Sequence, residues 1–596
     1  MNKFRKVAKP SATTRWIVST VLAVSAFTPA ITTVLPENAA GSLTAESVAW
    51  AASSASGSNG SQPLPGPASY DSGVQLSRTR DYMEQQRVAQ QIEEDKERKK
   101  SKVETQTVKP EESTATVTFT LKQVQTDPSE ILTEEEIKKI TDQYTGKTVS
   151  LQDLYDMTDA INAVYEKKGY SVCKAYLPPQ RIHEGMVHVG LLEGKTGNVV
   201  INGLRHTRKG YVANRIKLEP GKVANTDYLT ERLQRFNATN DVQLRILVHA
   251  GEKPGTTDYE IAAFEPKSNH AVSLYVDNAG YETSGRWREG IFYTMRSVTG
   301  QRDALRLNYL RSKGTNVFGV SYSLPVNNLG TMLDFDYGTN TTKITKGNLE
   351  SVGVKGHSYA AGLTLRHPLL VDDKRRYEVG LQFLHQNSQT DVGTKLDNYV
   401  KWVDDTRNSY IPYISFTHYG KSSVLYHKHS VAFIGYNNLY NTGDSCAAYR
   451  LDSMYQKQLG GGQMLSARLN AQVASERKNM SSSDLFYIGG VNSVRGYEES
   501  FLAGSQGFNA SLSWLVPLDK KRIFNAFAFF DYGRVFGDER TVLDNTLYST
   551  GLGVTASYKN FYSSLTLGIP LKREFESLQG QKVDRTRIHF NCSVAF

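Results

Sequence analysis

The 596-residue sequence has few of the residues that build disulfide scaffolds, metal centres or helical membrane bundles. Its three cysteines, Cys173, Cys446 and Cys592, exclude a disulfide framework, and nothing near them in the sequence has metal-ligand spacing. Beyond the N-terminus, no apolar run approaches the roughly 18 residues that a transmembrane helix needs, which excludes a helical membrane protein. Tyrosine (33) and glycine (47) are plentiful, whereas tryptophan (5) is scarce. Polar chains of this kind are typical of alternating β-strands, in a soluble sandwich or a membrane barrel.

The first 51 residues have the order of a secretory signal. Five basic residues precede an apolar stretch from Trp16 to Leu35, and small residues follow, with cleavage options at Ala49-Trp50-Ala51 and near Ala39-Ala40. We predict a signal peptide over residues 1–51, with a single membrane anchor as the alternative. Because the mature chain then leaves the cytoplasm, ATP and NADH are not expected, and we predict no cofactor.

A polar helix between two linkers is predicted next. Residues 52–70 are rich in Ala, Ser, Gly and Pro and read as a disordered linker. Residues 71–100 contain helix formers, with seven acidic and seven basic side chains and a thin apolar stripe. Such a helix is either surrounded by water or occupies a polar cavity. Residues 101–113 form a second linker.

Residues 114–267 alternate strand and helix patterns twice. We predict two small α+β domains, each of the order β-α-α-β-β, over residues 114–193 and 194–267. A capping box at Thr133 opens the first helix of the first domain, and Ser150-Leu-Gln-Asp153 opens the second. The predicted strands are Ala115–Val124, Ser171–Leu177, Met186–Glu193, Val199–Ile201, Val242–Ala250 and Asp258–Phe264, and the predicted helices of the second domain are Gly210–Leu218 and Asp227–Phe236.

From residue 268 to residue 596 the period-two alternation of strands replaces the helix pattern. Sixteen such stretches begin near residues 270, 288, 303, 315, 330, 357, 375, 408, 427, 446, 463, 506, 523, 549, 561 and 584. Connections after even-numbered strands are short, and those after odd-numbered strands are usually long, as at about 389–407 and 475–505. Short turns on one rim and long loops on the other are typical of an outer-membrane barrel of antiparallel strands.

Several motifs fail as chemical sites. Gly190 to Thr196 resembles a phosphate loop but has three residues between its glycines instead of four, and a strand follows it. Gly551 to Ala556 matches a loose dinucleotide fingerprint within an alternating strand. His427 and His429 share a strand face but have no visible third metal ligand. No nucleophile, acid or base arrangement exceeds chance, so we predict no enzymatic activity, no catalytic residues and no metal site.

One long loop and one later strand stand out. The loop contains Gly489-Gly490 followed by Val494, Arg495, Gly496 and Tyr497. A strand over Phe529-Phe530-Asp531-Tyr532-Gly533 places Asp531 on the face opposite Phe530 and Tyr532. If those two face lipid, Asp531 is an isolated carboxylate inside the barrel, and it requires a cation.

These residues carry a resemblance to a known family. Val494-Arg495-Gly496-Tyr497 resembles the VRGY loop signature of two-partner (type V) secretion transporters, the haemolysin and filamentous-haemagglutinin exporters of the outer-membrane insertase superfamily. Phe529, Asp531 and Gly533 resemble the F-x-D-x-G of their thirteenth barrel strand. Ala175 to Gln180, with Gly185 and Glu193-Gly194, is similar to the first polypeptide-transport-associated (POTRA) domain of that family.

The resemblance implies a bacterial outer-membrane translocator with periplasmic POTRA domains and a plug helix. It implies that Arg495 reaches into the lumen and pairs with Asp531, and that the terminal Phe596 is a signal for the barrel-assembly machinery. The implied substrate is an unfolded partner exoprotein of the haemolysin or adhesin kind, exported without nucleotide hydrolysis. Lipid is the expected surroundings, and no nucleic-acid partner is expected.

Three other functions stay open at this point. An insertase for other barrel proteins shares the loop motif but usually carries more POTRA copies and no plug helix. A passive porin would have no use for tandem α+β domains. An enzyme would need a constellation that the sequence does not contain.

Overall fold

The computed structural model describes residues 70–97, 104–105, 118–347, 349–372, 374–393, 399–439, 443–475, 480–537, 545–575 and 583–596. They form two compact units, one of Met1–Glu97 with Ser268–Phe596 and one of Arg98–Lys267. The predicted signal peptide (1–51), the linker 52–70 apart from Tyr70, and most of the linker 101–113 lie outside the described residues. No helix in the described part of the chain is long and apolar enough to cross a membrane.

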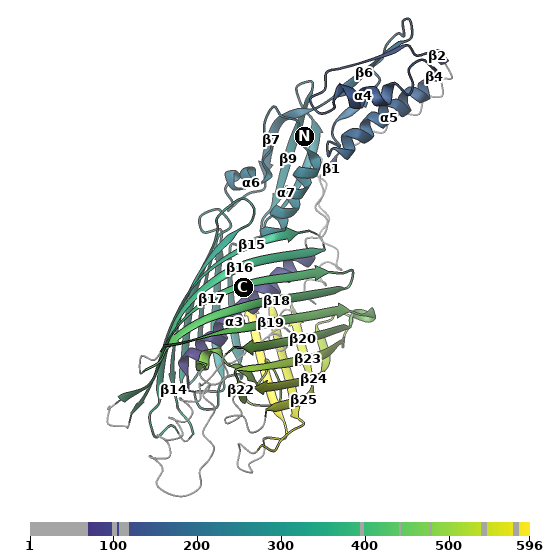
Figure 1. The fold of residues 1–596 in the computed structure, drawn as a ribbon. Coiled ribbons are helices and arrows are strands. Elements are labelled where there is room, and N and C mark those ends of the chain that lie inside the picture. The colour runs from purple at the N-terminus through teal and green to yellow at the C-terminus, as the bar shows by residue number, and fades with distance from the viewer. Residues whose placement is uncertain are drawn as a thin grey trace. The chain divides into compact units, whose positions relative to one another are not determined.

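Sixteen antiparallel strands of the described residues close into a barrel, which confirms the predicted fold class (Figure 1). Sequence neighbours pair throughout, except that a loop carrying a small hairpin lies between β20 and β23. The strands are β10 (His270–Asp277), β11 (Arg288–Arg296), β12 (Ala304–Arg311), β13 (Thr315–Pro325), β14 (Met332–Lys343), β15 (Lys355–Val371), β16 (Arg375–Gly393), β17 (Tyr399–Tyr419), β18 (Ser423–Asn437), β19 (Gly443–Gln458), β20 (Met464–Ala474), β23 (Gln506–Pro517), β24 (Phe524–Phe536), β25 (Thr546–Tyr558), β26 (Phe561–Pro570) and β27 (Arg587–Ala595).

Alternation along each strand separates an apolar outer wall from a polar lumen. On β24, Phe524 and Phe530 are exposed on the outside, whereas Asn525 and Asp531 are buried on the inside. Leucine, tyrosine and phenylalanine side chains are exposed in the same way on the other strands. An outward apolar band of this kind is what a lipid-facing barrel requires.

The barrel strands are longer on one side than the sequence pattern predicts. The predicted long connection at about 389–407 is wrong, because β16 continues to Gly393 and β17 begins at Tyr399, which leaves only residues 394–398 between them. The connections 312–314 and 438–442 are also short, although both follow odd-numbered strands. The apolar alternation that marks the lipid-facing part ends before the hydrogen-bonded ladder does, so strand ends above the membrane have no hydropathy signal.

The predicted polar helix is α3 (Ser72–Glu97), and it lies in the barrel lumen (Figure 1). Its first turn is buried against lumen side chains of the wall: Asn340 and Ser358 donate hydrogen bonds to the Ser72 carbonyl oxygen at 2.8 and 2.9 Å. The helix has almost no apolar stripe. A helix of this composition is stable here because the lumen supplies hydrogen-bond and charged partners for its polar side chains.

The first domain of the second unit packs two helices, α4 (Glu134–Thr141) and α5 (Leu151–Lys167), on a three-stranded sheet. The predicted capping box at Thr133 is confirmed, and the predicted helix start at Ser150 is a capping box as well. The sheet has the order β3-β6-β5, and a separate two-stranded ribbon joins β2 to β4. Its strands are β2 (Thr118–Thr120), β3 (Gln123–Thr126), β4 (Thr148–Ser150), β5 (Lys174–Tyr176) and β6 (Met186–Leu192).

Two features of the first domain differ from the sequence expectation. Residues 115–117 of the predicted strand Ala115–Val124 lie outside the described residues. The remainder is split between two sheets, because Leu121 turns into the core at full burial and interrupts the ladder. Cys173 lies in the same core, where burial raises the pKa of its thiol to about 12. The thiol therefore stays protonated and packs as a small apolar side chain.

The second domain repeats the plan with α6 (Lys209–Ile216) and α7 (Thr226–Thr239) against β7 (Lys195–Asn202), β8 (Gln243–Ala250) and β9 (Thr256–Phe264). Its sheet has the order β1-β8-β9-β7. The added strand, β1, is Glu104–Thr105 of the predicted linker, and it pairs in parallel with Leu247 and Val248 at the edge of β8. Two residues carry no period, so the sequence pattern does not predict this strand.

Candidate functional site

The connection between β20 and β23 folds back into the barrel instead of extending from it. It contains a 3-10 turn at Ser482–Asp484 and a hairpin of β21 (Phe486–Ile488) and β22 (Leu502–Gly504). The tip of the hairpin carries the four predicted loop residues, and Val494, Arg495 and Tyr497 are all buried there. The loop that stands out in the sequence, with its flanking glycines, is therefore buried inside the barrel.

Arg495 and Asp531 form a doubly hydrogen-bonded ion pair in the lumen. The Arg495 Nε and Nη2 atoms lie 2.7 Å from the Asp531 Oδ2 and Oδ1 atoms, and the Arg495 amide donates to Oδ2 at 3.0 Å. The side chains are 2% and 0% exposed. Paired charges at such burial depend on each other, because either one alone would be desolvated without compensation.

The barrel wall completes the surroundings of this pair. Ser511 and Ser513 accept hydrogen bonds from Arg495 Nη2 at 3.1 and 3.3 Å, and Ser511 donates to Asp531 at 2.7 Å. The guanidinium carbon lies 3.4 Å from the centre of the Phe529 ring, a cation–π contact. We call these five residues, Arg495, Asp531, Ser511, Ser513 and Phe529, the lock.

Two glycines make room for the loop at the wall. A Cβ atom on Gly533 would lie 2.9 Å from the Val494 side chain, so the strand glycine leaves space for the first residue of the loop signature. Gly496 has a φ of +95° and meets the backbone of Gly568 on β26, where a Cβ atom would lie 2.5 Å from the Gly496 nitrogen. Sequence reasoning missed Gly568, since a single glycine in a strand carries no signal of its partner.

The remaining predicted residues are also placed. The Tyr497 hydroxyl donates to the Lys572 carbonyl oxygen at 2.8 Å, and the Gly496 amide donates to His589 Nε2 at 3.1 Å. Phe596 follows the last strand with its side chain 71% exposed, and its amide donates to the Val272 carbonyl oxygen at 2.8 Å, next to the seam where β27 meets β10.

The outer end of α3, which we call the plug helix, is held by a capping carboxylate and an aromatic stack, without an ion pair among the contacts of the described residues. Asp71 caps the helix by accepting a hydrogen bond from the Gly73 amide at 2.8 Å, and it also bonds Ser388 and Ser482. Tyr70 stacks on Trp402 with ring centres 5.5 Å apart. Every residue from Tyr70 to Ser77 is buried.

One ion pair joins the plug helix directly to the loop. Arg78 Nη2 lies 2.8 Å from Glu499 Oε2, with the side chains 6% and 3% exposed. The other Glu499 oxygen accepts the Val491 amide at 2.8 Å, and Arg78 also donates to the Tyr281 hydroxyl at 2.5 Å. Glu499 follows the loop signature by two residues, so the helix and the lock share one hairpin.

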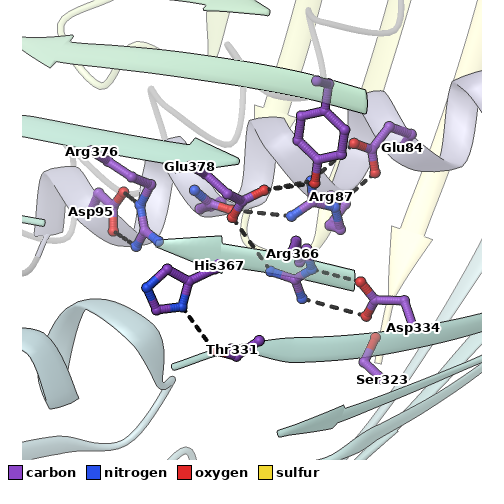
Figure 2. A network of polar contacts seen from close by, with 12 residues as sticks. Glu84, Arg87, Asp95, Ser323, Thr331, Asp334, Arg366, His367, Arg376 and Glu378 are labelled. Carbon is purple, nitrogen blue, oxygen red and sulfur yellow. Dashed lines mark hydrogen bonds and ion pairs between the residues drawn. The ribbon is translucent and has the colours of Figure 1, made fainter. Parts of the chain in front are cut away.

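The inner end of the plug helix is held by charges (Figure 2). Asp95 receives two hydrogen bonds from Arg376 at 2.7 and 2.8 Å. The other charged contacts lie within the helix, between helix and wall, or within the wall. Within the helix, Glu84 pairs with Arg87 (2.7 Å). Between helix and wall the pairs are Arg80–Asp336 (2.6 Å), Lys428–Glu84 (3.1 Å) and Arg87–Glu378 (3.9 Å), and within the wall they are Arg366–Glu378 (3.7 Å) and Arg366–Asp334 (2.6 Å). Two acidic residues of the same strand, Asp334 and Asp336, therefore both take part in these charged contacts.

A cavity of about 650 Å³ remains beside the plug helix. It is lined by helix residues such as Asp81 and Glu84 and by wall residues such as Arg306 and Asn470. Elsewhere, His429 Nδ1 lies 2.7 Å from the Tyr449 hydroxyl on the outer wall. Within the described ranges, no group of three His, Cys, Asp or Glu residues is arranged to hold a metal ion.

Comparison with known proteins matches both units. Residues 119–194 match the model of the POTRA domain, ShlB-type, and residues 255–556 match that of the haemolysin secretion/activation protein ShlB/FhaC/HecB. Heme/hemopexin transporter protein HuxB of Haemophilus influenzae (strain 86-028NP) is 24% identical over 77% of this chain and 85% of its own. Outer membrane transporter CdiB of Escherichia coli O6:K15:H31 (strain 536 / UPEC) is 20% identical over 76% and 79%. The solved structure of CdiB from Escherichia coli shares the fold, with a TM-score of 0.63 and 18% identity over 87% of this chain and 98% of that one.

Proposed function

Because the chain belongs to the haemolysin secretion/activation protein ShlB/FhaC/HecB family, we propose that it exports one unfolded partner exoprotein without nucleotide hydrolysis. It is an outer-membrane transporter of the two-partner secretion class, with its POTRA domains in the periplasm. We also propose that the chain has no enzymatic activity.

Recognition begins at the POTRA sheets. An extended peptide can add to the edge of a sheet, where backbone hydrogen bonds give affinity and neighbouring pockets give specificity. In the described residues of the first domain, β5 lies at a sheet edge, and Tyr176, Met186 and Leu192 expose apolar surface beside it. These side chains suit an unfolded segment whose own apolar residues are not yet buried.

The second domain offers an edge that the chain itself covers in part. The pair Glu104–Thr105 occupies Leu247 and Val248 of the eight-residue strand β8. A partner segment that pairs along the whole of β8 must displace this short strand. Two pairs form a weak ladder, so the exchange favours a longer partner.

Opening requires that the plug helix leaves the lumen. Sixteen strands enclose a channel wide enough for an extended chain once it is empty. The helix is bonded to the wall through hydroxyl, amide and charged groups, and water can replace those that are partly exposed, such as the Arg80–Asp336 pair, when the helix moves. The observation that carries the proposal is this polar helix inside a sixteen-stranded barrel, bonded to a loop that the lock holds inward.

Direction then comes from the passenger, because a chain that folds outside cannot slide back. No nucleotide is needed in this scheme. During biogenesis we propose that the exposed terminal Phe596 is presented to the barrel-assembly machinery.

The test is a comparison of strains with and without this chain, by proteomics of the medium and of the outer membrane. We expect one large protein to vanish from the medium while the outer membrane stays otherwise unchanged, which would also identify the partner. Depletion of many barrel proteins would instead establish an insertase and overturn the proposal.

A further inference from the structure

One corner of the rim that carries the short turns has an excess of positive charge, with three cations beside one carboxylate. The turn between β23 and β24 contains Lys520 and Lys521, both exposed, and the half-buried Arg522. None of the three pairs with a carboxylate among the described residues. The adjacent Asp519 is engaged with the backbone, accepting the Phe524 amide at 2.7 Å.

The neighbouring turn leaves open space beside these cations. Because β20 pairs with β23, the turn that contains Gly460, Gly461 and Gly462 lies next to the basic turn. A Cβ atom on Gly462 would lie 2.6 Å from the guanidinium carbon of Arg522, so the guanidinium lies directly on the glycine backbone. Cβ atoms on Gly460 and Gly461 would meet nothing within 4 Å.

Exposed apolar side chains continue from this corner onto the lipid-facing wall. Trp514, Leu518 and Phe524 are 49%, 60% and 53% exposed. The Trp514 indole N–H donates to Gln463 Oε1 of the glycine turn at 3.1 Å, so its polar edge lies at the level of the turns. A tryptophan with one wet and one apolar end is typical of the membrane interface.

We propose that this corner binds an anionic phospholipid of the periplasmic leaflet. Lys520, Lys521 and Arg522 take the headgroup phosphate, while Trp514 and Phe524 contact the acyl chains. A free phosphate would use the cations but not the apolar side chains, and the surface is continuous with the outward apolar band. Basic groups at the edge of a membrane span recognise anionic lipids by this combination.

Another basic turn of this rim makes the contrast. Between β15 and β16, Arg375 is neutralised by Asp372, whose Oδ2 lies 2.7 Å from its Nη2 atom. The hairpin of β23 and β24, by comparison, has unpaired cations at its turn and carries Ser511, Ser513 and Asp531 on its inner face. A lipid bound at this corner therefore contacts the outer side of the strands that form the lock.

The experiment measures how tightly the purified full-length chain retains added lipid, by native mass spectrometry with phosphatidylglycerol or phosphatidylcholine. We expect preferential retention of phosphatidylglycerol. In the K520A/K521A variant, affinity falls roughly 30-fold, from a loss of about 1 kcal/mol for each cation. The matched control is K421A/K457A, which removes two exposed cations from the same rim, next to β18.

All four substituted lysines are exposed, so we expect the barrel to fold in either variant, and heat-modifiable mobility on gels checks this. Equal retention of the two lipids by the unmodified chain would overturn the proposal. So would an equal loss in both double variants, which would indicate general attraction to the rim. Competition by millimolar inorganic phosphate alone would overturn the lipid assignment in favour of a free anion.

Discussion

Arg495 of the lock and Arg80 of the plug helix each face an aspartate, at 2.7 and 2.6 Å, but their surroundings differ. The lock side chains are 2% and 0% exposed, whereas Arg80 and Asp336 are 19% and 26% exposed. A fully buried charge must keep its partner, because separation leaves it without solvation. A pair in contact with water exchanges its partner for water at little cost. Two ion pairs of nearly equal length therefore behave differently: the buried Arg495–Asp531 pair persists, whereas the partly exposed Arg80–Asp336 pair separates easily.

The Arg78–Glu499 pair lies between these two cases. It belongs to the plug helix but is as buried as the lock, and Glu499 is part of the hairpin that carries Arg495. Departure of the helix leaves Glu499 without its cation inside the barrel. Helix release and loop movement should thus be coupled at this residue, while the partly hydrated pairs of the inner end should act independently of the lock.

The largest effect is expected from Asp531→Ala. The substitution leaves Arg495 buried and unpaired, a loss of about 3–5 kcal/mol. We expect export of the partner to fall by more than about tenfold while the barrel still inserts, because about 1.4 kcal/mol already changes an equilibrium tenfold. The measurement is secreted partner per amount of barrel in the outer membrane, and Arg495→Ala should behave alike.

The exposed aspartate Asp444 supplies the matched control, and Asp444→Ala should export normally. Normal export from both lock variants, at equal barrel abundance, would show that the buried pair has no part in translocation.

The second-largest effect is expected from Glu499→Gln. The amide still accepts the Val491 amide hydrogen but no longer neutralises Arg78, so this buried contact weakens by up to about 3 kcal/mol. We expect a higher open probability in planar bilayers, since the plug helix leaves more often. Its neighbour Glu498 has a side chain 53% exposed and lies 3.5 Å from Arg587. Glu498→Gln should therefore leave the open probability near that of the unmodified chain, and equal increases in both variants would contradict the coupling.

The lock and the plug helix also differ in how far the sequence predicts them. Period-two alternation predicts the barrel strands, and it places Asp531 inside because Phe530 is outside; the loop signature then supplies Arg495 as its partner. The structure places the two together as an ion pair, 2.7 Å apart. Their role in export stays a prediction.

The partners of the plug helix could not be predicted in the same way. A helix with an even mixture of charges has no face that indicates its orientation, so the contacts Arg78–Glu499 and Asp95–Arg376 carry no sequence signal. The strand β1 is too short for any period. The sequence pattern did not predict the extension of β16 and β17 beyond the apolar band, because the expected strand ends were placed from hydropathy alone.

Substitutions at the outer end of the plug helix should change the open probability less than Glu499→Gln does. Asp71→Ala removes the helix cap, which is worth about 1 kcal/mol, together with the bonds to Ser388 and Ser482. We expect a several-fold rise in open probability. Asp71→Asn keeps a capping oxygen and should restore most of the closed state. If the asparagine variant opens as often as the alanine variant, the cap does not hold this end.

The smallest effect is expected from Arg80→Ala, which removes the partly hydrated pair with Asp336. Such pairs contribute about 0.2–1 kcal/mol and are screened by salt. The open probability should rise less than about fivefold at low ionic strength, and the difference from the unmodified chain should shrink as salt approaches about 1 M, where charges are screened within about 3 Å. The same salt series should leave the difference caused by Glu499→Gln largely intact, because that pair is closed to water. If the change in open probability caused by Arg80→Ala were insensitive to salt, or as large as that caused by Glu499→Gln, buried and partly exposed ion pairs would not differ in how easily they separate.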